Sequence, residues 1–309
     1  MTASLHPFRQ VRLGALALGL VLAFVLAGCG SDDGPAGAGP AGASSGGESE
    51  TLQIGVGPLL PTPEDTTKAW DPFFAWLAGE LGVDYELTAT TDWAGISVAM
   101  RNDQIDLAWM GPFGYVLANT EAGAKAIATA KYDDKPIYHA IVVSRPDLDI
   151  ERWPEDGKGK SISFTDTGST SGWLIPTNWF RERGIDPKTY FEYSEGATHA
   201  ANQVAIANGR VDLATDFDRN RNALIEAGTI KPEQSKIVWE SEPLPNDAIA
   251  LRRGFDPELE AQIEEALLQL TPEEAAKILP NHYTGFVPAT PDTYAPIRDA
   301  AEAVGVLKK

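Results

Sequence analysis

The chain has 309 residues, with 44 acidic and 25 basic side chains and a formal net charge of −19. Binding to a nucleic acid needs a basic surface, so this balance argues against a nucleic-acid partner. It does not exclude a small anionic ligand, because neutral donors and a helix terminus can hold an anion inside a cleft.

The first residues have the pattern of an export signal. Arg9 and Arg12 precede an uncharged run from Leu13 to Gly28, which is 16 residues long. A membrane-spanning helix needs roughly 20 residues. A basic start, a short apolar run and small residues at its end are typical of a signal peptide, here residues 1–28. A retained membrane anchor is the alternative interpretation.

Cys29 favours the signal over the anchor. The segment Leu26-Ala-Gly-Cys29 resembles the lipobox of bacterial lipoproteins, in which the cysteine receives lipid and becomes the new first residue. Cys29 is the only cysteine of the chain, so it cannot form an internal disulfide or a multi-cysteine metal site. Residues 29–50 are nearly all Gly, Ala, Ser, Pro and acids and predict a flexible tether. The sequence therefore predicts an extracytoplasmic protein of the cell envelope, lipid-anchored to a membrane.

Short β-branched runs and helical patterns alternate from Thr51 onward. Gly82 stands where a first helix would stop, and Asp92 can cap a second one. Strands are predicted over residues 52–56, 85–90 and 105–110, and helices over residues 70–81, over residues 92–102 and after residue 112. This alternation is typical of βαβ units around a mostly parallel sheet, so the predicted fold class is α/β.

The same alternation restarts at Ser161, and a short motif is repeated in the two halves. Residues 102–108 and 208–214 share the pattern N-x-x-[IV]-D-L-A, each between a predicted helix and a predicted strand. Strand ends in open α/β sheets face the ligand crevice, so two similar lobes predict a binding cleft between them. A chance match of so short a motif is the alternative.

Two β-rich runs associated with prolines, residues 137–145 and 237–251, are predicted to carry the chain from one lobe to the other and back. Lobe 1 would comprise residues 51–142 and a return segment, 247–309, and lobe 2 residues 143–246. Within the return segment, helices are predicted over residues 257–270, 272–279 and 293–304. Two crossings make a two-strand hinge, the architecture of clamshell receptors.

The stretch from Asp166 to Pro176, Asp-Thr-Gly-Ser-Thr-Ser-Gly-Trp-Leu-Ile-Pro, follows a predicted strand and leads into a helical pattern. A Gly/Ser/Thr loop at a helix start gathers free backbone N–H groups and hydroxyl donors at the positive end of the helix dipole. It therefore predicts a cradle for a tetrahedral oxyanion. An ordinary helix cap is the alternative, since Ser and Thr cap helices in many proteins.

Several motifs in the same order resemble the phosphonate-binding proteins of bacterial ABC importers. They are Thr91-Asp-Trp-Ala-Gly95, Ala108-Trp-Met-Gly-Pro112, Gly168-Ser-Thr-Ser-Gly172 followed by Pro176, and His199 ahead of the second N-x-x-V-D-L-A. The resemblance covers nearly all of residues 52–304. It implies a type II periplasmic-binding-protein fold of two α/β lobes, a phosphonate-type oxyanion ligand, an ABC permease as partner, a monomer, and neither cofactor nor metal.

The resemblance also implies site residues. Ser169, Thr170 and Ser171 would hold the head-group oxygens with backbone N–H groups. His199 would donate from the opposite wall, or else only pack at a lobe edge. Asp247 matches a pocket acid that accepts from a protonated phosphonate oxygen or a ligand amine; its alternative role is that of a surface turn residue.

Two residues depart from the family pattern. Trp93 and Met110 fall where relatives commonly place tyrosines; Trp93 keeps an N–H donor, and Met110 has none. If both line the pocket, it is more apolar than usual and favours a substituted phosphonate; core packing is their alternative role. The loop of residues 216–221 carries both charge signs where relatives contact the ligand's substituent. Its side chains cannot be oriented from the sequence.

Two other functions remain as alternatives. An exported α/β hydrolase is disfavoured, because Gly168-Ser-Thr-Ser-Gly172 has Thr170 at the centre where a nucleophile elbow has serine. In addition, no motif supports His139, His199 or His282 as a general base, and no metal or P-loop motif is present. A subunit that reports its bound ligand to a membrane signalling kinase has the same sequence features as a transport receptor.

Overall fold

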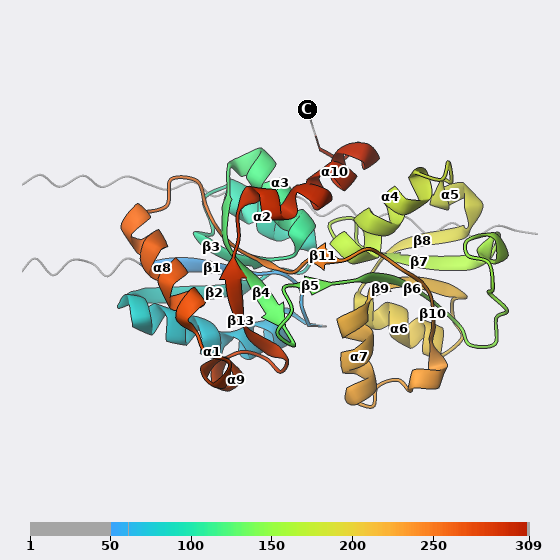
Figure 1. The fold of residues 1–309 in the computed structure, drawn as a ribbon, viewed down its shortest axis with the longest axis horizontal. Helices are drawn as coiled ribbons and strands as arrows, with labels where there is room; N and C mark the ends of the chain where they lie inside the picture. The colour runs from blue at the N-terminus through green and yellow to red at the C-terminus, as the bar shows by residue number, and fades with distance from the viewer. Residues whose placement is uncertain (1–50, 61, 308–309) are drawn as a thin grey trace, which may run out of the picture. The chain divides into compact units, whose positions relative to one another are not determined.

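The computed structural model describes residues 51–60 and 62–307. The predicted signal peptide (residues 1–28), the predicted tether (29–50) and the predicted lipidation site Cys29 lie outside the described residues. Within the described part, strands and helices alternate as the sequence predicts, and the strands form two main sheets (Figure 1).

The first sheet has six strands in the order β13-β4-β12-β3-β1-β2. β1 pairs in parallel with both β2 and β3, whereas β12 is antiparallel to β3 and β4, and β13 is antiparallel to β4. The strands are β1 (Thr51–Val56), β2 (Asp84–Ala89), β3 (Leu107–Met110), β4 (Lys125–Tyr132), β12 (Ala248–Leu251) and β13 (Tyr283–Pro288). The segment after Asp247 thus supplies a strand to the middle of this sheet.

The second sheet has five strands in the order β10-β6-β9-β7-β8. β7 is parallel to β8 and β9, and β6 is antiparallel to β9 and β10. The strands are β6 (Ala140–Ser144), β7 (Ser161–Thr165), β8 (Glu192–Ala197), β9 (Leu213–Phe217) and β10 (Lys236–Glu240). β6 begins at Ala140, so the chain enters this sheet slightly before the boundary predicted after residue 142.

Two short strands connect the sheets. β5 (Ile137–Tyr138) and β11 (Leu244–Pro245) pair antiparallel, with Tyr138 opposite Leu244. The chain leaves the first sheet through β5 and returns to it through β11, and both strands run between the two groups of strands in Figure 1. The two predicted crossings are therefore hydrogen-bonded to each other.

The helices begin and end at residues that suit their positions. Asp92 caps the second helix by accepting from the N–H of Gly95 at 2.7 Å, and Gly82 ends the first with a φ of 67°. The helices are α1 (Pro63–Leu81), α2 (Trp93–Arg101), α3 (Pro112–Ala122), α4 (Ile175–Arg181), α5 (Pro187–Tyr190), α6 (His199–Ala207), α7 (Asp218–Glu226), α8 (Pro257–Gln269), α9 (Pro272–Ile278) and α10 (Ala295–Val304). Short turns are η1 (Glu155–Gly157), η2 (Thr170–Leu174), η3 (Pro232–Gln234) and η4 (Pro291–Tyr294).

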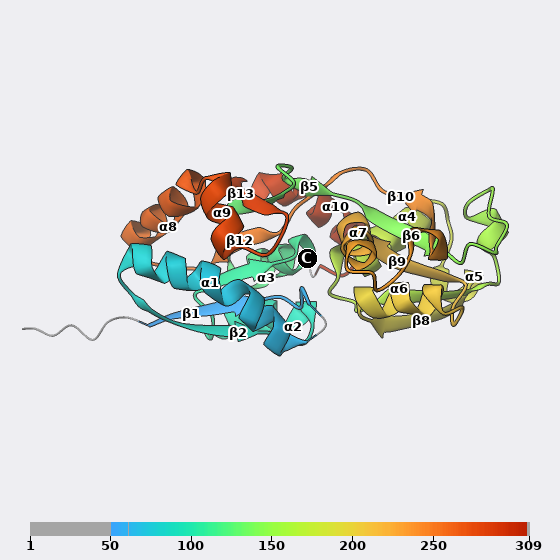
Figure 2. The same ribbon diagram turned by 90° about the horizontal axis from the view of Figure 1, so that it is seen from below.

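Helices pack against the sheets and bury apolar cores. Figure 2 shows α1, α8 and α9 near the first sheet and α6 and α7 near the second. A cluster of aromatic rings joins α1 to the first sheet, where Phe73 meets Trp109 edge-to-face at 5.7 Å. No helix of residues 51–60 and 62–307 is long and apolar enough to cross a membrane.

Candidate functional site

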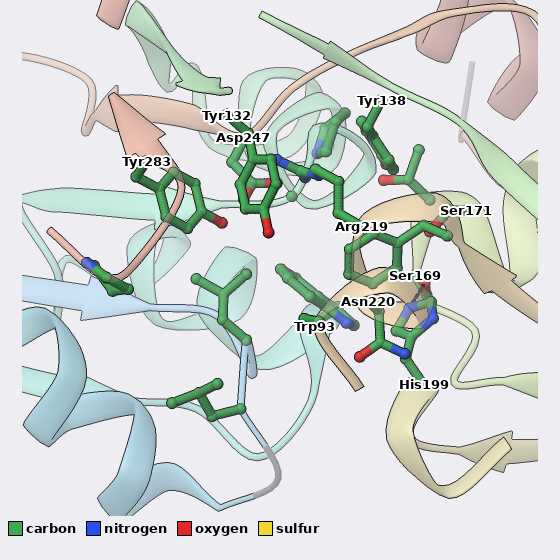
Figure 3. A pocket seen from close by; sticks show the side chains of 18 of the residues that line it. Trp93, Tyr132, Tyr138, Ser169, Ser171, His199, Arg219, Asn220, Asp247 and Tyr283 are labelled. Atoms are coloured by element: carbon green, nitrogen blue, oxygen red, sulfur yellow. Dashed lines mark hydrogen bonds between the residues drawn. The ribbon is translucent and has the colours of Figure 1, made fainter. Parts of the chain in front are cut away.

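A cavity of about 180 Å³ is lined by residues that belong to both sheets and their helices. The predicted residues Ser169, Ser171, His199, Trp93 and Asp247 all lie in its wall (Figure 3). Thr170, which is also a predicted site residue, lines the cavity too. The other lining residues are Leu59, Leu60, Trp70, Gly111, Pro112, Tyr132, Tyr138, Phe217, Arg219, Asn220, Ala223, Pro280, Asn281 and Tyr283. The residues that the family resemblance predicts come from four separate stretches of the chain, and all of those named here line the same cavity.

The predicted oxyanion cradle forms a π-helical turn. β7 ends at Thr165, and Ser169 caps η2, whose five residues continue directly into α4. The Ser169 Oγ accepts from the N–H of Gly172 at 3.1 Å. First-turn N–H groups have no partner within their helix, so those of Thr170 and Ser171 are free for an acceptor outside it. Turns of this kind are frequent at functional sites.

A hydrogen-bonded chain of three side chains leads from the cradle into the second sheet. The Ser169 Oγ lies 3.0 Å from His199 Nε2, and His199 Nδ1 lies 2.9 Å from Asp216 Oδ1. A neutral imidazole that donates from Nδ1 to Asp216 accepts at Nε2 from the Ser169 hydroxyl. The carboxylate thereby fixes the ring orientation of His199 and its tautomer.

Asp216 is fully buried at the end of β9, and its carboxylate has several donors. Gln203 Nε2 donates to it at 2.6 Å, and Asn220 Nδ2 lies 2.9 and 3.0 Å from its two oxygens. The order serine–histidine–aspartate is that of a hydrolase triad. No local motif pairs Asp216 with His199, because the two residues are 17 positions apart and lie on different elements.

Thr170 and Ser171 are both buried and have different surroundings. The Thr170 Oγ1 accepts from the backbone N–H of Phe113 at 2.9 Å. Phe113 lies in the first turn of α3, beside the first sheet, so this bond joins the two halves of the cavity wall. Ser171 faces the cavity, which Tyr138 also lines.

Trp93 and Asp247 complete the wall on the side of the first sheet. Trp93 packs so closely on the backbone that a Cβ on Gly57 would lie 2.5 Å from its ring. Asp247 is buried and accepts from Trp109 Nε1 at 3.1 Å. Burial raises the pKa of Asp247. The Arg219 charge and hydrogen bonds from Trp109 and Tyr283 lower this pKa, but the effect of burial is larger.

Met110 is a correction to the sequence analysis. It lies at the end of β3, fully buried in an apolar core with Ile96 and Phe113, and it is not among the residues that line the cavity. Side chains of a strand alternate between its two faces, so Met110 points away from the face that Trp109 supports. Met110 therefore gives no reason to expect that the cavity prefers a substituted phosphonate.

Three tyrosines that the sequence analysis missed supply hydroxyl donors instead. Tyr132, Tyr138 and Tyr283 all line the cavity, from β4, β5 and β13. Burial raises the pKa of Tyr132 to about 12 and raises those of Tyr138 and Tyr283 as well, so these hydroxyls keep their protons. No local motif marks them, because each comes from a strand end that only the folded sheet brings to the cavity.

Arg219 enters the same cavity from α7 (Figure 3). Its guanidinium carbon lies 4.7 Å from the ring centre of Tyr132 and 4.9 Å from that of Tyr138. The predicted substituent-contacting loop of residues 216–221 thus contributes Arg219 and Asn220 to the wall, whereas Arg221 turns away and bonds to Ser235 at 2.9 Å.

Beside the cavity, His282 connects the two halves of the protein. Its Nδ1 lies 2.9 Å from Asp133 Oδ1 and its Nε2 lies 3.0 Å from Glu226 Oε2. Asp133 follows β4 of the first sheet, and Glu226 ends α7 beside the second. The hydrogen bond to Asp133 raises the pKa of His282, against a smaller effect of burial, and Glu226 raises it further.

Comparisons with known proteins agree with this architecture. The chain is 27% identical to the phosphate-import protein PhnD of Mycolicibacterium smegmatis, over 93% of this chain and 94% of that protein. It is 28% identical to the phosphonates-binding periplasmic protein of Escherichia coli, over 75% of this chain and 70% of that protein.

Two solved structures show the same fold. A binding-protein component of an ABC phosphonate transporter from Pseudomonas aeruginosa has a TM-score of 0.73 at 24% identity, covering 82% of this chain and 86% of its own. A Prochlorococcus marinus protein solved in complex with methylphosphonate has a TM-score of 0.73 at 17% identity, covering 83% and 99%. The fold is the type II periplasmic-binding-protein fold, with two α/β lobes joined by β5 and β11.

The model of one protein family, described as "ABC transporter, phosphonate, periplasmic substrate-binding protein", matches residues 59–294. This match spans most of the described chain and includes every predicted ligand-binding residue. The chain therefore belongs to the family of periplasmic substrate-binding proteins of phosphonate ABC transporters.

Proposed function

We propose that this protein captures a phosphonate-type oxyanion in the cavity between its two lobes and delivers it to an ABC importer. The observation that carries the proposal is the meeting of the capped η2 turn with His199 at one end of the cavity. Relatives described as phosphate-importing, phosphonates-binding and methylphosphonate-bound have ligands with a tetrahedral phosphorus group in common. Proteins of this family are binding proteins and not enzymes, so Asp216 serves to orient His199 for binding.

The proposed binding step uses hydrogen bonds only. The head-group oxygens accept from the N–H groups of Thr170 and Ser171 and from the hydroxyls of Ser169 and Ser171. His199 Nε2 lies beside Ser169 at the same end of the cavity, on a ring that Asp216 orients, and contacts the head group there. Tyr138 and Asp247 meet the same ligand from the side of the first lobe. The two lobes, which the sequence analysis placed at residues 51–142 with 247–309 and at residues 143–246, close on the ligand as a monomer.

The test is a comparison of serine variants by calorimetry. Losing one hydrogen bond to a charged group costs about 1.5–3 kcal/mol, so Ser169→Ala/Ser171→Ala should bind methylphosphonate and phosphate at least about tenfold more weakly. Ser194→Ala is the control, because Ser194 bonds to Ile162 O in the second sheet, away from the cavity. Circular dichroism should show all three proteins folded. Equal affinities in the wild type and the double variant would refute the cradle.

We also propose that Cys29 carries a lipid anchor that holds the protein at the extracytoplasmic face of a membrane. The basis is the lipobox-like Leu26-Ala-Gly-Cys29 at the end of a short apolar run. One acyl chain binds a membrane only marginally, whereas several hold firmly. Cys29→Ser should therefore yield released or unprocessed protein on fractionation. Processed protein that stays as firmly attached would contradict the anchor.

A further inference from the structure

Arg219 places a permanent positive charge in the cavity, apart from the groups assigned to the head group. It is the second residue of α7, and its side chain extends between Tyr132 and Tyr138 (Figure 3). Its guanidinium carbon lies 4.7 Å, 4.9 Å and 5.6 Å from the ring centres of Tyr132, Tyr138 and Phe217. Arginine cannot lose its proton in a protein, so this charge is present at every working pH.

Two donor atoms of the Arg219 side chain are left unused by the described part of the chain. Its Nε and Nη1 atoms are shielded from solvent and have no hydrogen-bond partner among the described residues. No carboxylate of residues 51–60 and 62–307 lies within 4.0 Å of its guanidinium. Trp70, another residue of the cavity wall, also has an unpartnered buried N–H at Nε1. Buried donors without partners are rare. Other such atoms occur elsewhere in the described residues, but those of Arg219 and Trp70 belong to the wall of one cavity, where a ligand can supply acceptors.

The aromatic rings around Arg219 give a second argument, about what the ligand cannot be. Faces of Tyr132, Tyr138 and Phe217 make a cage of the kind that binds ammonium groups. The guanidinium of Arg219 already fills this cage. A ligand amine could not enter this cage, because the guanidinium occupies it. The charge of Arg219 would also repel the amine at short range, where screening by water is weak.

We infer that Arg219 binds a second anionic group of the ligand, so that the cavity selects phosphonates that carry a carboxylate over phosphonates that carry an amine. The inference rests on the proposed function, which places the phosphonate head group at Ser169, Ser171 and His199. A guanidinium presents parallel N–H donors that match the two oxygens of a carboxylate. Asp247, the one carboxylate among the lining residues, is held by Trp109 at 3.1 Å.

The test is calorimetry with four ligands that share the head group. Methylphosphonate reports the head-group site alone, while phosphonoacetate, propylphosphonate and 2-aminoethylphosphonate differ in the charge of a substituent of similar length. For the wild type we expect phosphonoacetate to bind at least about tenfold tighter than propylphosphonate, and 2-aminoethylphosphonate to bind more weakly than propylphosphonate.

Variants assign the preference to Arg219. Arg219→Met should bring the affinities for phosphonoacetate and propylphosphonate to within about threefold of each other, and Arg219→Lys, which keeps the charge but loses the parallel donors, should fall between. Arg221→Met is the matched control. It removes the same charge from the same helix, but Arg221 bonds to Ser235 at 2.9 Å and does not line the cavity. Arg221→Met should keep the wild-type ratio of the affinities for phosphonoacetate and propylphosphonate. This result would show that net charge alone does not cause the preference.

The outcomes separate this inference from the proposed function. If methylphosphonate binds but the wild type prefers the amine or shows no preference, the inference is wrong and the proposed function stands. If Arg221→Met lowers the ratio as much as Arg219→Met does, a general charge effect replaces the inference. Phosphate and phosphite serve as two further probes. If neither of them and none of the four phosphonates binds, both the inference and the proposed function are wrong.

Discussion

Two glycines on either side of Ser169 face different neighbours. A Cβ on Gly168 would lie 2.8 Å from the backbone nitrogen of Ala94 and 3.0 Å from Trp93 Cβ, both on α2 beside the first sheet. A Cβ on Gly172 would lie 2.0 Å from Thr165 Oγ1, within the same lobe. Neither glycine has a positive φ, so alanine would act at both positions only through these contacts.

We therefore expect the two alanine variants to fail in different ways. Overpacking costs about 1–3 kcal/mol. In Gly168→Ala this cost keeps the lobes apart, so ligand affinity should fall about tenfold or more, with little change in Tm. In Gly172→Ala the cost lies within lobe 2, so Tm should fall by several degrees. Calorimetry and thermal melts of both proteins check this. Wild-type affinity in Gly168→Ala would mean that the ligand-bound form lacks this contact.

At the scale of elements, the repeated N-x-x-[IV]-D-L-A motif has the same structural task in both lobes. Asp106 accepts from the N–H of Gln53 at 2.9 Å, and Asp212 accepts from the N–H of Ser161 at 3.0 Å. Each aspartate thus fixes the start of the neighbouring parallel strand, β1 or β7.

An arginine meets each of these aspartates in the same way. Arg252 donates from Nε to Asp106 and Arg145 lies 3.4 Å from Asp212, and both arginine backbone N–H groups donate to the carbonyl of the same aspartate. This double correspondence makes a chance match of the two motifs untenable. The motif marks one βαβ unit that occurs once in each lobe.

The elements of this fold follow from local patterns that the sequence displays. Asp92 and Gly82 mark helix ends because capping depends only on residues a few positions away. The strand predicted over residues 105–110 begins only at Leu107, and Asp106, just before it, bonds to Gln53 of β1. The helix predicted over residues 293–304 starts with a separate turn, η4, before α10.

The residues that line the cavity could be predicted from the sequence only where they belong to a local motif. Ser169 and His199 belong to local motifs of the family, and both line the cavity. Tyr132 and Tyr283 reach it from the ends of two strands that pair although about half the chain separates them, so no local pattern places them. Arg219 and Arg221 are two residues apart on α7, and only the packing of that helix decides which one faces the cavity.

At the scale of the whole molecule, the bridge from His282 to Asp133 and Glu226 makes contact between the lobes sensitive to pH. The two carboxylates raise the pKa of His282 above its ordinary value of 6.5. The bridge is therefore fully present below that value and is lost as the pH rises through the raised pKa. Since Glu226 belongs to the other lobe, closure should be favoured at acidic pH.

We expect wild-type protein to bind methylphosphonate tighter than Glu226→Gln at pH 6, with the difference vanishing by pH 9. The groups are largely exposed, so the effect should be a few tenths to about 1 kcal/mol, up to about fivefold in affinity. Calorimetry at each pH gives the ratio of the two proteins' affinities. Because the ligand ionises equally with both proteins, its own ionisation does not affect this ratio. A ratio that does not change with pH would show that the bridge contributes nothing to binding.

The strand order of the first sheet has a consequence for folding. β12, residues 248–251, lies between β3 and β4 and pairs with both. Until those residues join them, β3 and β4 have no bond to each other and each leaves an edge unpaired. Pairing between segments so distant in sequence is intrinsically slow. A nascent chain that ends before residue 248 therefore lacks the strand that joins β3 to β4, and it cannot complete its first lobe.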